Sequence, residues 1–378
     1  MKRLTALVGA CVLVDTMFYA ALTPLLPRYA SELGLSKTGA GVLAGSYAVG
    51  ALVAGVPGAL AASWLGVKRT LLIGLSGMVV TTVLFGFART AWLLDLARFL
   101  QGASSSCSWT AALAWLVADS PPDARGRLIG SAMGAAIFGA LLGPVIGAVA
   151  AVAGTRATFS GVACVGLALA VWTLRSSTRY EPRRQRVSLL ARALTNARVS
   201  ASVWFVALPS LGFGVLNVLV PLRLSALGLG SVAIGAIWLA GSGVEAAASP
   251  VVGHVSDRRG RLLPLRVGLV GAAIAFALLP FLRGQWWLLA PGVFVCGLTL
   301  GVFWAPAMSM LSDEADAIGL DYAFGFALIN LAWAPAQIVG AAGGGALADA
   351  ASDAAPFATL AALSALTLAA LWRYRSSS

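Results

Sequence analysis

Long apolar runs separated by short polar segments extend along the whole chain. A helix that crosses a bilayer needs about 20 mostly apolar residues, because its backbone polar groups must be satisfied within the segment. Twelve such runs are present, so the pattern predicts an all-α membrane protein with twelve transmembrane helices. The predicted spans are 4–27, 39–62, 70–88, 93–118, 128–153, 157–174, 201–222, 231–253, 263–282, 286–310, 321–347 and 355–372.

The first run follows Lys2 and Arg3 and in this respect looks like a signal peptide. It is longer than such segments, carries Asp15 near its middle and lacks a cleavage site of small residues. We therefore expect it to be a retained membrane helix.

The composition agrees with a membrane protein, and the distribution of basic residues indicates how the chain is oriented in the membrane. The chain of 378 residues is 59% hydrophobic and 11% charged, with a net charge of +12. Soluble domains carry about 25% charged residues, so soluble, disordered and coiled-coil classes are excluded. With the N-terminus in the cytoplasm, 19 of the 26 Lys and Arg residues fall inside, 6 fall outside and Arg98 lies within a span. This excess predicts cytoplasmic termini in a cell (inner) membrane, and no nucleic-acid partner is expected.

A basic stretch, 175–200, divides the chain into two halves of six spans each, 1–174 and 201–378. We expect this stretch to be a cytoplasmic linker that lies on anionic lipid headgroups. The halves share the pattern P-x-x-x-S-x-L-G-L, at 27–35 and at 221–229, with an offset of 194. The same offset places Gly41 on Gly235, Gly66 on Gly260 and Asp119 on Asp313. Such a repeat is the layout of transporters that bind substrate between two halves near the bilayer midplane.

The loop between spans eight and nine carries a motif. Its sequence matches G-x-x-x-D-[RK]-x-G-[RK]-[RK] until the last position, and the matching residues are Gly253, Asp257, Arg258, Gly260 and Arg261. Through this motif the chain resembles the major facilitator superfamily, over essentially its whole length. The resemblance implies two pseudo-symmetric six-helix bundles and an ion-paired latch in this loop at the cytoplasmic gate. A simple positive-inside anchor is the alternative, although it would not require Asp257.

The corresponding loop of the first half lacks the Asp-Arg pair but keeps Gly66, Lys68 and Arg69. The loop between spans ten and eleven carries Asp313 and Glu314 without any basic residue. We expect Lys68 and Arg69 to pair with these acids across the halves, in place of the lost latch. The alternative is solvated loop charges that contribute little.

Span four contains Arg98, Gln101 and Gly102, similar to the family element R-x-x-Q-G. An arginine in mid-bilayer costs about 2.5–3.5 kcal/mol on insertion scales, so it should face a cavity or a partner. One interpretation is a structural salt bridge with Asp95, three residues earlier on the same helix face. The other is a charge relay that tunes a carboxylate in the transport pathway.

Span five resembles an antiporter signature of the same superfamily, G-x8-G-x3-G-P-x2-G-G. The matching residues are Gly130, Gly139, Gly143, Pro144 and Gly147, with Ala148 in place of the last glycine. Three of these glycines recur every four residues and form a stripe where another helix can approach closely. Generic close packing would require only this stripe. Within the superfamily the full signature resembles drug/proton antiporters rather than uptake symporters.

Two acids are candidates for proton coupling. Asp15 lies about 16 Å along the first helix, near the midplane of a core about 30 Å thick, and Glu245 occupies the middle of span eight. An unpaired carboxylate at such depth favours its neutral form and can exchange protons near neutral pH. Structural polar pairing is the alternative for both residues.

Other polar and aromatic residues in the spans are candidates for contacts with a substrate. Tryptophans in this set could stack on an aromatic or cationic compound, or could simply pack or anchor at the interface. With Asp15, the candidates are Gln101, Trp109, Asn217, Trp238, Trp304, Asn330, Trp333 and Gln337.

The sequence contains no phosphate-binding loop, no metal-ligand cluster and no nucleophile-base pair, so we expect neither an enzyme nor a cofactor. The pattern favours a monomeric secondary transporter of a small molecule, coupled to protons and embedded in the lipid bilayer. Efflux of a hydrophobic or cationic drug or metabolite is the first hypothesis. Proton-coupled uptake of a sugar or amino acid is the second, and a non-transporting membrane receptor is a third.

Overall fold

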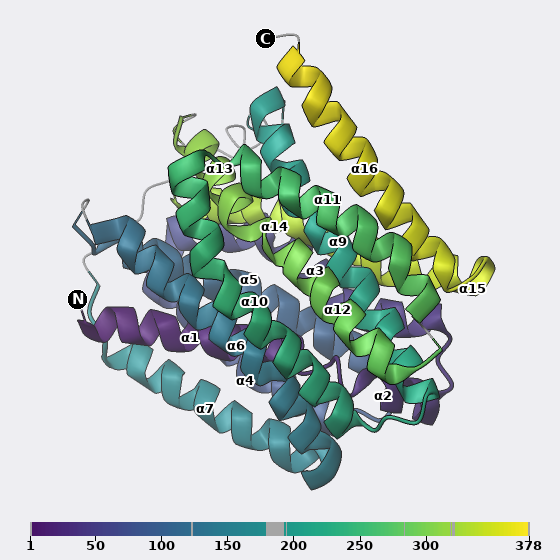
Figure 1. The fold of residues 1–378 in the computed structure, drawn as a ribbon. Helices are drawn as coiled ribbons and strands as arrows, with labels where there is room; N and C mark the ends of the chain where they lie inside the picture. The colour runs from purple at the N-terminus through teal and green to yellow at the C-terminus, as the bar shows by residue number, and fades with distance from the viewer. Residues whose placement is uncertain are drawn as a thin grey trace.

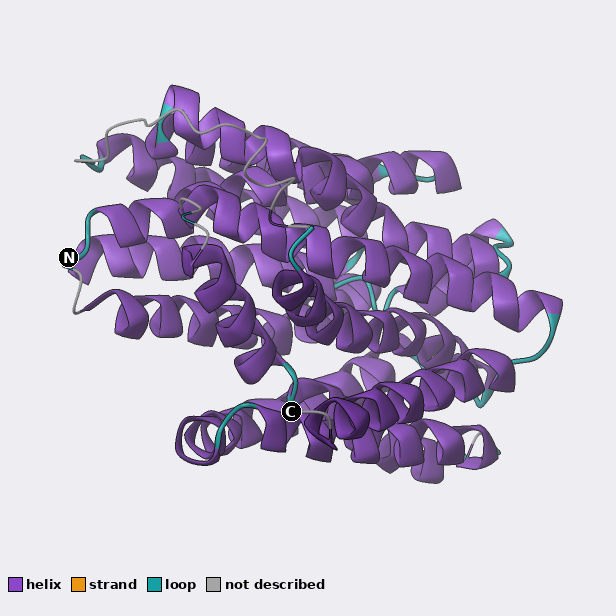
Figure 2. Cartoon of the chain, turned by 90° about the horizontal axis from the view of Figure 1, so that it is seen from above, coloured by secondary structure: helices purple, strands orange, loops and turns teal. Residues whose placement is uncertain are grey.

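The computed structural model describes residues 2–121, 124–178, 193, 195–282, 284–317, 319 and 322–376. All regular structure in these residues is helical, and no strand occurs among them (Figure 2). The predicted all-α class is confirmed. Most of the predicted basic linker, together with Arg283, lies outside the described residues.

The helices form two groups in chain order, which Figure 1 shows in purple to blue-teal and in darker teal through green to yellow. The N-terminal group contains α1 (Lys2–Ala20), α2 (Leu26–Leu33), α3 (Lys37–Leu65), α4 (Val67–Phe87), α5 (Ala91–Ala118), α6 (Arg125–Ala153) and α7 (Thr155–Arg175). The C-terminal group contains α9 (Ala197–Ala226), α10 (Ser231–Arg259), α11 (Leu262–Leu278), the 3-10 turn η2 (Leu279–Leu282), α12 (Trp286–Gly301), α13 (Trp304–Ala317), α14 (Tyr322–Ile338), the π-helical turn η3 (Val339–Gly343), α15 (Gly344–Ala350) and α16 (Ala354–Ser376).

Eleven helical segments of the described chain are long and apolar enough to cross a membrane. The remaining predicted span, 93–118, corresponds to α5, which has 28 residues but is less apolar because it contains Arg98, Gln101 and a run of serines. This helix packs mainly against α3 and α4 and also against α1. Its polar side chains therefore find partners within the protein rather than in lipid.

Two predicted spans are interrupted in the structure. The first ends as a helix at Ala20, and a turn over residues 21–25 precedes α2. Pro24 and Pro27 lack backbone donors, which explains why the helix does not continue through this segment. The tenth span breaks at Val302 and Phe303, between α12 and α13.

Backbone geometry repeats at the offset seen in the sequence. Gly34 and Gly228 both have positive φ, at 63° and 92°. Gly66 and Gly260, which join successive helices on the opposite side, have φ of 87° and 84° and ψ of 155° and 157°. Side chains other than glycine rarely adopt such φ values. The two groups therefore use the same turns at equivalent positions.

We call the side where α1 begins and α16 ends the terminal side, and the opposite side the far side. The groups meet where α3 packs against α14, η3 and α15, and where α6 packs against α10. On the far side Lys37 forms an ion pair with Asp353. The amide and the hydroxyl of Thr38 also donate to Oδ2 of Asp349, at 2.8 and 2.7 Å. These contacts tie the start of α3 to the C-terminal group.

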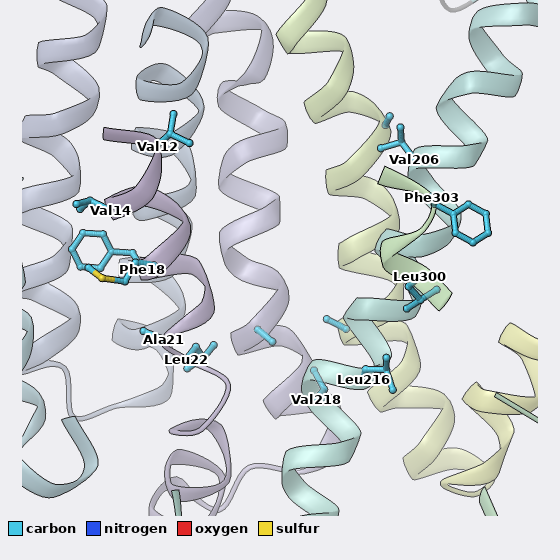
Figure 3. Close-up of a cluster of buried hydrophobic side chains, with 14 of the residues drawn as sticks. Val12, Val14, Phe18, Ala21, Leu22, Val206, Leu216, Val218, Leu300 and Phe303 are labelled. Carbon is cyan, nitrogen blue, oxygen red and sulfur yellow. The ribbon is translucent and has the colours of Figure 1, made fainter. Parts of the chain in front are cut away.

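Each group also has apolar side chains in its own interior. Figure 3 shows Val12, Val14 and Phe18 on α1, and Leu300 and Phe303 where α12 ends, all of them buried. Apolar packing of this kind holds the helices around the polar side chains described next.

Candidate functional site

The carboxylate of Asp15 is 5% exposed and has three donors on one of its oxygens. Oδ2 accepts from Nε1 of Trp109 at 2.6 Å, from the hydroxyl of Ser105 at 2.7 Å and from the hydroxyl of Tyr47 at 3.2 Å. The other oxygen, Oδ1, has no hydrogen-bond partner among the described residues. The donors hold the carboxylate in place, and Oδ1 can still take a proton.

Arg98 of α5 lies behind this carboxylate and is 2% exposed. Its guanidinium donates to the carbonyl oxygens of Phe18 and Tyr19, each at 3.2 Å, and to Oε1 of Gln101 at 3.3 Å. It also lies over the ring of Tyr47, 4.8 Å from the centroid. Arg98 therefore holds the last turn of α1 in place.

The predicted salt bridge between Arg98 and Asp95 is absent from the described ion pairs, and the charge-relay interpretation stays a prediction. Arg98 and Asp15 do not form a direct ion pair either. Tyr47 lies between them, because its hydroxyl donates to the acid while its ring faces the guanidinium. Opposite charges at such depth favour each other's charged form across a short distance.

Contacts from this cluster cross to the C-terminal group. Tyr19 makes an edge contact with Trp333 of α14, with ring centroids 5.6 Å apart, and its ring also lies against Tyr47. Four predicted candidates, Asp15, Gln101, Trp109 and Trp333, thus join one network. Two further candidates pair with each other on the C-terminal side, where Oδ1 of Asn217 accepts from Nε1 of Trp238 at 2.9 Å.

A second crossing contact lies beside the first. Nδ2 of Asn330 on α14 donates to the hydroxyl of Ser106 at 3.0 Å. Ser106 directly follows Ser105, which donates to Asp15. Adjacent residues of α5 therefore contact the acid and the opposite group.

Among the described residues, no hydrogen bond or ring contact joins the remaining candidates to the Asp15 cluster. Glu245, the second predicted proton-coupling acid, is half-buried and packs against Gly301 at the break between α12 and α13, where a β-carbon on the glycine would lie 2.6 Å from Cγ of the acid. Trp304 stacks on Phe213 with centroids 6.3 Å apart. Gln337 is 2% exposed, and its Oε1 has no partner among the described residues.

The predicted cross-half latch is wrong in this structure. Nζ of Lys68 donates to the carbonyl oxygens of Leu174 and Ser176, at 2.9 and 2.7 Å, so it caps the end of α7. Asp313 instead accepts from Arg261, at 2.6 Å, within the C-terminal group. Lys68 satisfies orphan carbonyls at a helix end, and the turn at Gly260 brings Arg261 to the acid first.

The other predicted gating residues are solvent-facing. Arg69, Asp257 and Arg258 are exposed, and Gly253 has open space around it. Only Arg261 and Asp313 of the predicted gating set form an ion pair among the described residues.

The glycine stripe of α6 lies against α1, as expected for a close helix crossing. A β-carbon at Gly143 would lie 2.5 Å from Cβ of Ala20 and 2.8 Å from the carbonyl oxygen of Met17. Gly139 and Gly147 face the backbone of α1 in the same way, whereas Gly130 has nothing within 4 Å. The carbonyl of Pro144 faces Gly235 of α10, so α6 contacts both groups at this level.

Comparison with known proteins identifies the family. The sequence profile of the Major Facilitator Superfamily matches residues 8–334 and 210–378. The chain belongs to this superfamily. Solved superfamily structures share its fold: the xylose transporter XylE from E. coli covers 98% of both chains with a TM-score of 0.77 at 14% identity. A nucleoside transporter, NupG, covers 97% of this chain and 99% of its own, with a TM-score of 0.76 at 15% identity.

Identity in sequence to several curated transporters is higher than to these structures. The synaptic vesicular amine transporter of Bos taurus is 26% identical over 280 residues, which cover 72% of this chain and 54% of the relative. A probable vesicular acetylcholine transporter of Danio rerio is 30% identical over 179 residues, covering 44% of this chain and 36% of the relative. The chain thus spans about half the length of the vesicular amine relative.

Four residues of the polar cluster around Asp15 were not predicted from the sequence: Tyr19, Tyr47, Ser105 and Ser106. A tyrosine does not interrupt the pattern of an apolar run, because its ring is hydrophobic. The serines carried a usable signal, since a polar run inside a predicted span indicates a face turned toward other helices.

Proposed function

We propose that this protein is a proton-coupled antiporter that exports a hydrophobic organic cation by alternating access. The carboxylate of Asp15 carries the proposal, because it is buried, held by three donors and open to protonation on Oδ1. A group that alternates between charged and neutral states can exchange a proton for a cation. Asp15 is proposed as the main proton site and Glu245 as a second acid on the C-terminal side.

The relatives support a cationic cargo. The matched sequences include an amine transporter and a probable acetylcholine transporter. The nearby indoles and phenols supply aromatic faces suited to a cation, and those in the network are Tyr19, Tyr47, Trp109 and Trp333.

Contacts between the groups on the far side define the conformation. Lys37 and Thr38 join the C-terminal group there. The excess of basic residues supports a cytoplasmic location for the terminal side, with the protein in the cell membrane. We propose that this conformation receives its cargo from the cytoplasm and that the two groups rock to release it outside.

The test uses purified protein in liposomes with a pH-sensitive dye in the lumen and an imposed proton gradient. A panel of amines, quaternary ammonium compounds, sugars and amino acids is added one at a time. Efflux of a cation coupled to proton movement is expected in the wild type and is expected to fall to the protein-free background in Asp15→Asn. Asp95→Asn is the matched control, because Asp95 is half-buried on α5 and makes none of the cluster's contacts.

Two results would contradict the proposal. Proton-coupled accumulation of a sugar or amino acid, with no response to cations, would favour uptake. Undiminished cation-proton exchange in Asp15→Asn would exclude this residue as the proton site.

A further inference from the structure

We propose that Tyr19 is the positioning residue that transmits the protonation state of Asp15 to the C-terminal group, so that protonation loosens closure of the far side. The inference rests on the proposed function for its purpose, and it assigns a regulatory role to a residue outside the acid itself. The geometry gives three steps, from the acid to the arginine, from the arginine to α1, and from α1 to α14.

The first step concerns two opposite buried charges, on Asp15 and Arg98, which Tyr47 separates. Asp15 is the acid that faces Arg98 among the described residues, and no salt-bridge partner of Arg98 is described. The ionisable groups around the two charges are Cys11, Tyr19, Tyr29 and Tyr47. None of them is an anion at neutral pH. When Asp15 gains a proton, the buried guanidinium loses its counter-charge, which makes its position unfavourable.

The second step is the hold of Arg98 on α1. Its two terminal nitrogens donate to the carbonyl oxygens of Phe18 and Tyr19, in the last turn before α1 ends at Ala20. Carbonyls in the last turn of a helix have no intrahelical partner, so the arginine replaces the missing donors. The turn that follows contains Pro24 and cannot extend the helix. Movement of the guanidinium toward water therefore releases the backbone that positions Tyr19.

The third step is the contact between groups. The rings of Tyr19 and Trp333 make an edge contact, with centroids 5.6 Å apart. Trp333 belongs to α14, which continues through η3 and α15 to the far-side contact at Asp349. Release of Tyr19 thus removes a contact of the helix that carries one half of the far-side closure.

Another tyrosine of the same group provides a control. Tyr29 of α2 is 5% exposed, and its ring makes an edge contact with Phe85, with centroids 5.9 Å apart. That contact lies within the N-terminal group, so loss of the ring at Tyr29 removes similar packing without touching the C-terminal group.

The test measures amide hydrogen exchange by mass spectrometry on the full chain in lipid nanodiscs at one fixed pH, without substrate. The segment followed is the start of α3 and the region from η3 to α15. Asp15→Asn mimics the protonated acid and is expected to raise exchange there by about threefold or more, a size typical of coupled contacts. In a Tyr19→Leu background, exchange in this segment is expected to be the same with and without the change at Asp15. In a Tyr29→Leu background, the full increase caused by Asp15→Asn is expected.

Tyr19→Phe keeps the ring and therefore the contact with Trp333, so the increase in exchange caused by Asp15→Asn is expected to persist in this variant. Loss of the increase in Tyr19→Leu together with its persistence in Tyr19→Phe supports the proposal. A full increase in Tyr19→Leu overturns it, as does an unchanged exchange rate in Asp15→Asn. Because no substrate is present, loss of this coupling and failure of the proposed antiport are separate results.

Discussion

Replacement of Gly143 by alanine tests the crossing of α6 and α1 most directly. The new β-carbon would lie 2.5 Å from Cβ of Ala20, 2.8 Å from the carbonyl oxygen of Met17 and 3.0 Å from the carbonyl carbon of Ala20. Ordinary contacts between carbon atoms begin at about 3.5 Å. Most of the crowding comes from backbone and from a side chain too short to turn away, so α1 and α6 must separate.

The magnitude follows from a comparison with Gly130 on the same helix, where nothing lies within 4 Å of an added β-carbon. Both substitutions replace glycine by alanine, so both gain the same helix propensity, about 1 kcal/mol. The difference between the two variants therefore isolates the packing cost. Overpacking in a close-packed interior costs about 1–3 kcal/mol, so Gly143→Ala should be less stable than Gly130→Ala by this amount.

The assay is equilibrium unfolding in mixed micelles with increasing denaturing detergent, followed by tryptophan fluorescence for both variants and the wild type. Gly130→Ala should unfold like the wild type or at slightly higher detergent. Equal unfolding free energies for the two variants would refute the close crossing of α1 and α6 at Gly143.

Two further predictions concern contacts at the two sides of the membrane. Gly235→Ala places a β-carbon 2.9 Å from the carbonyl oxygen of Pro144, so it should wedge α10 from α6 and raise the reactivity of a cysteine introduced on the far side; unchanged reactivity would contradict a tight closure there. Asp313→Asn should change stability by less than about 1 kcal/mol, because its ion pair is exposed, and its effect should add to that of Lys68→Gln in thermal unfolding. A strong non-additive effect of that pair would restore the cross-half latch that the geometry contradicts.

The spans were predictable because the bilayer imposes a length and a polarity that are visible in one dimension. The stripe through Gly143 followed from the helical period alone. Partners were harder to predict, since they depend on how each helix is rotated about its axis. Nothing in the order of residues shows that Trp109 and Tyr47 meet the same carboxylate oxygen.

The wrong prediction has a similar cause. Lys68 and Asp313 have complementary charges, and the pattern alone favoured their pairing. The structure shows that each has a nearer partner, a helix end for Lys68 and Arg261 for Asp313. Charge complementarity in loops identifies candidates, whereas backbone turns such as the one at Gly260 decide which of them meet.

The modest hydropathy of α5 has a consequence for how the protein is made. A helix that carries Arg98 and a run of serines is poorly suited to leave the insertion machinery for lipid by itself. The carbonyls that receive Arg98 belong to α1, and the helices that cover α5 most extensively are α3 and α4. All three precede α5 in the chain and are synthesised before it. The order of synthesis therefore provides the polar residues of α5 with protein partners as soon as the helix enters the membrane.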